Sequence, residues 1–177
     1  MNLNKFSKTL FALSCMFAAN SAHAIEITYD TVDLPDIVVG EDLWQYTYTV
    51  NDYVFNTDNI FSIYFDHQLY SDLQNPVPSV NADWNLETFQ PINSLSVAGV
   101  YDALSLANGA SLADPFTVSF NWLGNGTPGA QAFDLYDNNF NTVASGFTSP
   151  VPEPSSILLM LSGLLGLSVF RKKFSLK

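Results

Sequence analysis

The stretch LWQYTYTV, residues 43–50, alternates large apolar and polar side chains from Trp44 to Val50. Successive side chains of an extended chain point to opposite faces, so this pattern predicts a half-buried β-strand. Trp44, Tyr46, Tyr48 and Val50 would lie on the buried face. The stretch FTVSFNW, residues 116–122, alternates just as strictly and predicts a second strand of the same kind.

Further strands are expected where short apolar runs lie between clusters of turn-forming residues. These runs are residues 25–29, 60–65, 95–100, 131–136 and 142–147, and the last two predict a hairpin around residues 137–139. Asn, Asp, Gly and Pro separate them, notably at residues 56–59, 75–78, 108–110 and 124–129. We therefore expect an all-β fold, an antiparallel β-sandwich of roughly seven to nine strands, and a jelly-roll order is compatible with it.

The charges of the chain are distributed very unevenly. Residues 25–150 contain 16 of the 17 Asp and Glu residues and none of the six Lys and Arg residues. A domain with this charge cannot neutralise phosphates, which excludes nucleic acid as a partner, and it would bind an acidic polysaccharide only through bridging cations. The single cysteine, Cys15, lies outside these residues, so the domain has no disulfide and depends on its core for stability.

The first 24 residues have the organisation of a signal peptide. Lys5 and Lys8 precede an apolar stretch from Leu10 to Ala19, and the small residues Ala22 and Ala24 follow it. This order of basic, apolar and small residues is what a signal peptidase reads, so we expect a signal helix and cleavage after Ala24.

The other end of the sequence has three parts. Pro152, Glu153 and Pro154 are followed by the apolar run 157–170 and then by Arg171, Lys172 and Lys173. As a helix, these 14 residues would span roughly 21 Å, less than the roughly 30 Å of bilayer hydrocarbon. The basic residues after the run fit a cytoplasmic end. A short hydrophobic helix that enters a membrane is therefore expected.

This three-part tail resembles the PEP-CTERM sorting signal. The resemblance implies that an exosortase recognises the tail in the inner membrane of a Gram-negative bacterium, after export by the general secretory route, and removes it on delivery to the cell surface or extracellular matrix. Residues 1–24 would then be the signal peptide, 25–149 the acidic β-sandwich and 150–177 the sorting and anchor segment. Residues 44–48 and 121–131 also look similar to segments of other small PEP-CTERM proteins, a likeness that carries over no catalytic residue.

Few side chains in the domain suit catalysis. His67 is its only histidine and no G-x-S-x-G turn accompanies it, which disfavours a serine hydrolase. The carboxylate pairs Asp83 with Glu87 and Asp134 with Asp137 are nominal candidates for a glycosidase.

Two binding sites are conceivable from residue type alone. Oxygen ligands suit Ca²⁺, and Asp134, Asp137, Asn138 and Asn139 lie close together in the sequence, without the pattern of an EF-hand loop. Trp84 has polar neighbours, so we expect it to be exposed and able to stack on a sugar ring. No cofactor other than calcium is suggested.

The sequence thus favours a non-enzymatic surface or matrix protein that associates with exopolysaccharide in a biofilm. Its expected partners are signal peptidase, the exosortase and, transiently, the inner membrane. A carbohydrate-binding or calcium-dependent adhesion module is the alternative, and a small glycosidase is a third hypothesis.

Overall fold

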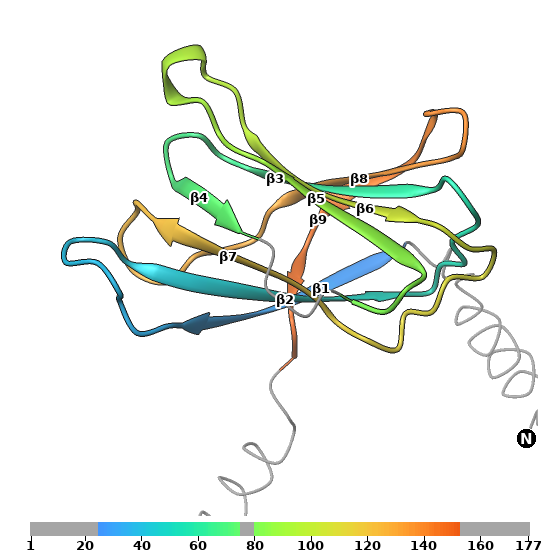
Figure 1. Ribbon diagram of the computed structural model, residues 1–177, viewed down its shortest axis with the longest axis horizontal. Helices are drawn as coiled ribbons and strands as arrows, with labels where there is room; N and C mark the ends of the chain where they lie inside the picture. Colours follow the sequence, from blue (N-terminus) through green and yellow to red (C-terminus); the bar gives the residue numbers. More distant parts are fainter. Residues whose placement is uncertain (1–24, 75–79, 153–177) are drawn as a thin grey trace, which may run out of the picture.

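The computed structural model describes residues 25–74 and 80–152, which form two five-stranded sheets packed face to face (Figure 1). The predicted all-β sandwich is therefore confirmed. The signal helix and the apolar helix expected in residues 1–24 and 157–170 lie outside the described residues.

Sheet A contains the strands in the order β10-β1-β2-β7-β4. Their bounds are β10 Ser149–Pro150, β1 Glu26–Asp33, β2 Leu43–Asn51, β7 Phe116–Trp122 and β4 Tyr70–Gln74. Neighbouring strands are antiparallel except that β10 runs parallel to β1. The pairing of β1 with β10 places the last described residues of the domain beside its first ones.

Sheet B contains the strands in the order β5-β6-β3-β8-β9, all antiparallel. Their bounds are β5 Trp84–Phe89, β6 Gly99–Ser105, β3 Ile60–Phe65, β8 Ala132–Tyr136 and β9 Thr142–Phe147. The expected final hairpin is confirmed as β8 and β9. One short 3₁₀ helix, η2 Asn93–Leu95, lies between β5 and β6.

The prediction of a strand at residues 95–100 is wrong. A tight turn occupies the first part of that stretch. Ser96 caps the end of η2 with a left-handed backbone of φ 53°, and Ile92 forms a β-bridge with Val97. The strand β6 begins only at Gly99, where a Cβ atom would lie 2.7 Å from Leu73. The apolar residues before Gly99 therefore close a loop instead of extending the sheet.

The core between the sheets is mainly aromatic. Tyr46 stacks on Phe120 with ring centroids 4.9 Å apart, and Phe61 meets Phe116 edge to face at 4.7 Å. Both strands recognised by their alternation, β2 and β7, turn their apolar face into this core as predicted. Aromatic pairs at these distances add to the stabilisation that burial gives.

The prediction that Trp84 is exposed is wrong, because its side chain is only 5% exposed. It packs edge to face on Phe55 and Phe116, and its indole N–H donates to the carbonyl of Ser111 over 2.8 Å. The polar residues around it belong to a turn, where the Asn81 side chain accepts a hydrogen bond from the Asp83 amide. Trp84 is thus a core residue with a satisfied polar atom and is no stacking platform.

A buried hydrogen-bonded group, the tyrosine–glutamine cluster of Tyr46, Tyr48, Tyr70 and Gln131, joins the two sheets. The Gln131 amide nitrogen donates to the hydroxyls of Tyr46 and Tyr70 at 2.6 and 2.9 Å. Its carbonyl oxygen accepts from the Tyr48 hydroxyl at 3.0 Å. The tyrosines belong to sheet A, while Gln131 directly precedes β8 of sheet B. Because buried polar groups need partners, this cluster fixes how the sheets meet at one end.

Candidate functional site

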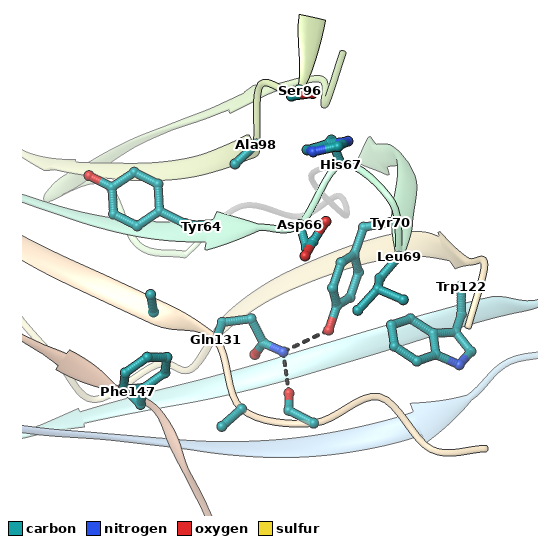
Figure 2. A pocket seen from close by; sticks show the side chains of 13 residues that line it. Tyr64, Asp66, His67, Leu69, Tyr70, Ser96, Ala98, Trp122, Gln131 and Phe147 are labelled. Atoms are coloured by element: carbon teal, nitrogen blue, oxygen red, sulfur yellow. Dashed lines mark hydrogen bonds between the residues drawn. The ribbon is translucent and has the colours of Figure 1, made fainter. Parts of the chain in front are cut away.

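A cleft of about 530 Å³ opens at the end of the sandwich where the tyrosine–glutamine cluster lies. Its walls come from the turn between β3 and β4, the loop before β6, the segment before β8 and the end of β9. Figure 2 shows Phe147 and Trp122 on opposite sides of Gln131 and Tyr70, with Asp66 and His67 above them. Aromatic rings and hydrogen-bonding groups therefore surround one space.

The floor of the cleft is rigid because its polar groups are already bonded. Gln131 is 3% exposed and holds Tyr70 in place through its amide. The carbonyl of Gly129 accepts from the Tyr46 hydroxyl at 2.6 Å and also contacts the Gln131 amide. Burial raises the pKa of the Tyr46 hydroxyl above its ordinary value, so that this hydroxyl stays protonated and donates.

The polar side chains Asp66 and His67 lie at the mouth of the cleft, and each hydrogen-bonds a neighbouring residue. The His67 Nδ1 atom lies 3.2 Å from Asn93 Oδ1, so its partner is an amide and not a carboxylate. One Asp66 oxygen accepts the Gln68 amide at 2.8 Å and thereby closes the turn after β3. Asp66 therefore shapes the turn, and the Asn93 side chain orients the His67 ring.

The cleft continues onto the outer face of sheet B through an aromatic row. In register across the five strands, this row consists of Phe89, Val100, Tyr64, Ala132 and Phe147. Phe89, Tyr64 and Phe147 lie two strands apart from one another, about 10 Å for each step. Phe147 is 74% exposed, so the row presents a large ring to solvent at the cleft.

Beside the aromatic row runs a second row of carboxylates and hydroxyls. It consists of Glu87, Asp102, Ser62, Asp134 and Ser145, again one residue from each strand. Ser62 donates to Asp102 and Ser145 to Asp134, both over 2.5 Å. Burial raises the pKa of the Asp102 carboxyl, and repulsion from Glu87 adds to this although the Ser62 hydrogen bond opposes it. The row offers hydrogen-bond acceptors across the whole face.

The two carboxylates predicted to hold calcium, Asp134 and Asp137, both accept hydrogen bonds within the β8–β9 hairpin region. Asp134 accepts hydrogen bonds from Ser145, Tyr64 and Tyr136, of which the Ser145 bond lowers its pKa most. Asp137 closes the β8–β9 turn, where Asn141 and the Asn139 amide donate to it and lower its pKa. Within residues 25–74 and 80–152, no group of three His, Cys, Asp or Glu side chains could hold a metal ion. Calcium stays a prediction.

Asn138 and Asn139 hydrogen-bond each other in the same exposed turn, at 2.8 Å. In the nominal glycosidase pairs, Asp83 accepts a hydrogen bond from the Ser111 backbone amide, while Glu87 lies opposite Asp102 in the neighbouring strand.

Three residues of the cleft, Gln131, Tyr64 and Phe147, were not identified as site residues from the sequence. Once the strand register is known, the alternation of side chains along the strands marks Tyr64 and Phe147 as outward-facing.

Of the predicted processing residues, only Pro152 is described, just after β10. Ala22, Ala24, Glu153, Pro154, Arg171, Lys172 and Lys173 lie outside the described residues. In the part of the chain that the structure describes, no helix is both long enough and apolar enough to cross a membrane.

The solved structures similar to this chain include several cohesin modules. One, from a family 33 glycoside hydrolase of Clostridium perfringens, is 10% identical over 72% of this chain and 96% of that chain, with a TM-score of 0.39. A type I cohesin in a cohesin–dockerin complex from Clostridium thermocellum is 15% identical over 72% and 99% of the two chains, with a TM-score of 0.37. A type II cohesin from a scaffoldin of Acetivibrio cellulolyticus is 16% identical over 72% and 87%, with a TM-score of 0.35. None of the curated proteins compared matches the chain.

A family model of the PEP-CTERM protein-sorting motif matches residues 150–173. The match covers the Pro-Glu-Pro tripeptide, the apolar run and the Arg-Lys-Lys end on which the resemblance rested. It begins inside β10 and so joins directly onto the sandwich. The chain therefore carries a PEP-CTERM protein-sorting motif, and it is an exported bacterial surface protein of the kind that an exosortase sorts.

Proposed function

We propose that this protein is a non-enzymatic component of the cell surface or extracellular matrix whose sandwich binds a glycan at the cleft and along the aromatic row. One observation carries the proposal: exposed and half-buried rings line a cleft of about 530 Å³ beside a continuous row of hydrogen-bond acceptors. Clefts with apolar walls and a few placed polar groups are typical binding sites. Sugar rings combine an apolar face with hydroxyl donors, which suits this arrangement.

The charge of the domain narrows the class of glycan. Residues 25–150 contain no Lys or Arg to pair with uronic acids, sulfates or phosphates. The acceptors on the face, Glu87, Asp102 and Asp134, suit hydroxyl or amino groups. A neutral or amino-bearing exopolysaccharide is therefore the favoured ligand, with an association in the biofilm matrix of a Gram-negative host after export across the inner membrane.

The test uses exopolysaccharide purified from the host and two matched variants. Phe147→Ala removes an exposed ring at the cleft and should weaken binding roughly fivefold, which corresponds to about 1 kcal/mol. Phe140→Ala is the control, because Phe140 is equally exposed at 76% but lies in the β8–β9 turn at the other end of that hairpin. Binding is measured by calorimetry with and without Ca²⁺.

Equal affinities for the wild type and Phe147→Ala would contradict the proposed site. Binding that appears only with Ca²⁺ would support the calcium-dependent adhesion alternative instead. Release of reducing sugars during the incubation would favour the glycosidase hypothesis, and absence of binding under both conditions would remove the glycan proposal.

A further inference from the structure

The sorting motif and the folded domain share residues. The motif match begins at residue 150, and Pro150 is the second residue of β10, the edge strand of sheet A that pairs with β1. In the register, Thr28 lies beside Ser149 and Tyr29 beside Pro150. The start of the motif is therefore a strand of the sandwich and not a free linker.

The one backbone N–H group of residues 150–152 is bonded to β1. Pro150 and Pro152 have no N–H group, so Val151 supplies the one backbone donor among residues 150–152. That N–H donates to the carbonyl of Tyr29 over 2.9 Å. The Ser149 hydroxyl donates to Glu26 over 3.1 Å and adds a side-chain contact to the same strand.

The residue just before β10 is held much more firmly than β10 itself. Thr148 is 3% exposed, and two hydrogen bonds join it to the backbone of Gln131. Its backbone N–H donates to the Gln131 backbone carbonyl at 2.8 Å, and its hydroxyl accepts the Gln131 backbone N–H at 2.9 Å. Beyond it, Pro150 and Val151 are exposed and the pairing with β1 spans two residues. Short, exposed pairings at the end of a chain open more easily than the core.

Enzymes that act on extended peptides recognise them largely through main-chain hydrogen bonds. The one donor of residues 150–152 is used by Tyr29, and the sandwich covers one side of this segment. We infer that β10 is a clasp: it must detach from β1, pivoting about Thr148, before the exosortase can take up the beginning of the sorting motif. Detachment frees residues 149–151, a tether of about 10 Å. The step is non-covalent, and it depends on the sorting motif and not on the proposed glycan binding.

A disulfide between β1 and β10 tests the inference in the full-length chain. Thr28→Cys with Ser149→Cys places one cysteine on each of two paired residues of β1 and β10. Neighbouring strands lie about 4.8 Å apart, which is within the Cα–Cα span of a disulfide. The only native cysteine, Cys15, lies far upstream in the predicted leader. The variants are expressed in the host, and conversion of precursor to processed protein is followed in spheroplasts by pulse-chase with and without dithiothreitol. We expect loss of processing in the oxidised double variant and recovery of processing after reduction.

Two controls separate the clasp from other effects of the substitutions. Each single-cysteine variant should be processed as the wild type is. Insertion of Gly-Ser-Gly-Gly after Val151 in the double variant should restore processing without reduction, because it adds unpaired chain between the engineered disulfide and the rest of the sorting motif. Wild-type processing of the oxidised double variant would overturn the inference, and so would failure of the insertion to restore processing. Neither result would bear on glycan binding, which is measured separately.

Discussion

The most informative single change is Gln131→Leu, because it removes the amide that joins the two sheets. Gln131 is 3% exposed, and its amide nitrogen donates to the hydroxyls of Tyr46 and Tyr70. Each of these bonds is worth about 1 kcal/mol net. The Tyr48 hydroxyl would also lose the acceptor that it now reaches at 3.0 Å, and an unpaired buried hydroxyl costs about 1–3 kcal/mol. Leucine recovers part of this by apolar burial, so we expect a loss of about 3 kcal/mol in the free energy of unfolding.

Part of that cost is specific to Tyr48 and can be isolated. In a Tyr48→Phe background the hydroxyl is absent, so Gln131→Leu should cost about 1–2 kcal/mol less than in the wild type. The four proteins of this cycle are compared by urea unfolding followed by tryptophan fluorescence. Gln68→Leu serves as the control, since Gln68 is exposed on the nearby β3–β4 turn and should change stability by no more than about 0.5 kcal/mol. A loss below about 1 kcal/mol for Gln131→Leu, with additive effects in the cycle, would refute the role given to the cluster.

Two further changes in sheet B test the backbone strain at Phe140 and the buried carboxylate of Asp102. Phe140 has a left-handed backbone with φ 61° in the β8–β9 turn, so Phe140→Gly should stabilise the protein by about 1 kcal/mol in urea unfolding. Burial raises the pKa of Asp102, and its ionisation therefore lowers stability as the pH rises through that pKa. Asp102→Asn should raise the melting temperature at pH 7, and this gain should vanish below pH 3.8, where Asp102 is protonated in both states.

Three strands have the bounds that the sequence predicts. Residues 60–65, 116–122 and 142–147 form β3, β7 and β9, and in β7 the apolar side chains are buried as the alternation predicts. The strands β4 and β5 were missed, since both are short edge strands with polar residues such as Asp72 and Glu87. An edge strand needs little apolar sequence when most of its side chains face solvent.

The misjudged position of Trp84 has a related cause. Polar neighbours in sequence indicated exposure, yet these residues shape a turn while the ring itself points between the sheets. Other acidic residues near turns have a similar structural role. Asp36, Asp66 and Asp83 accept backbone amides of Leu43, Gln68 and Ser111, so their carboxylates organise loops of the sandwich. Asp and Asn in turns indicate turn chemistry first, and ligand binding needs further observations.

The cleft could not be found from sequence because it depends on register. Its residues come from segments as distant as 64 and 147, and only the pairings of β3 with β8 and of β8 with β9 align Tyr64 with Phe147. The sequence marks Gln131 only as the first residue of an expected strand, and its role appears once the tyrosines of β2 and β4 are placed against it. Long-range pairing of this kind leaves no local pattern in a single sequence.

The clasp and the tyrosine–glutamine cluster meet at Thr148, and this junction separates two ways in which a mutation can affect sorting. Thr148 is bonded to the backbone of Gln131, whose side chain holds the sheets together, so detachment that stops at Ser149 leaves the core intact. Changes in β10 should therefore alter processing at unchanged stability. Gln131→Leu should lower stability but leave the pairing of Val151 with Tyr29 in place, so that its folded fraction is still processed through the same release of β10. Measuring both quantities in both kinds of variant distinguishes opening of the clasp from unfolding of the domain as the step that exposes the sorting motif.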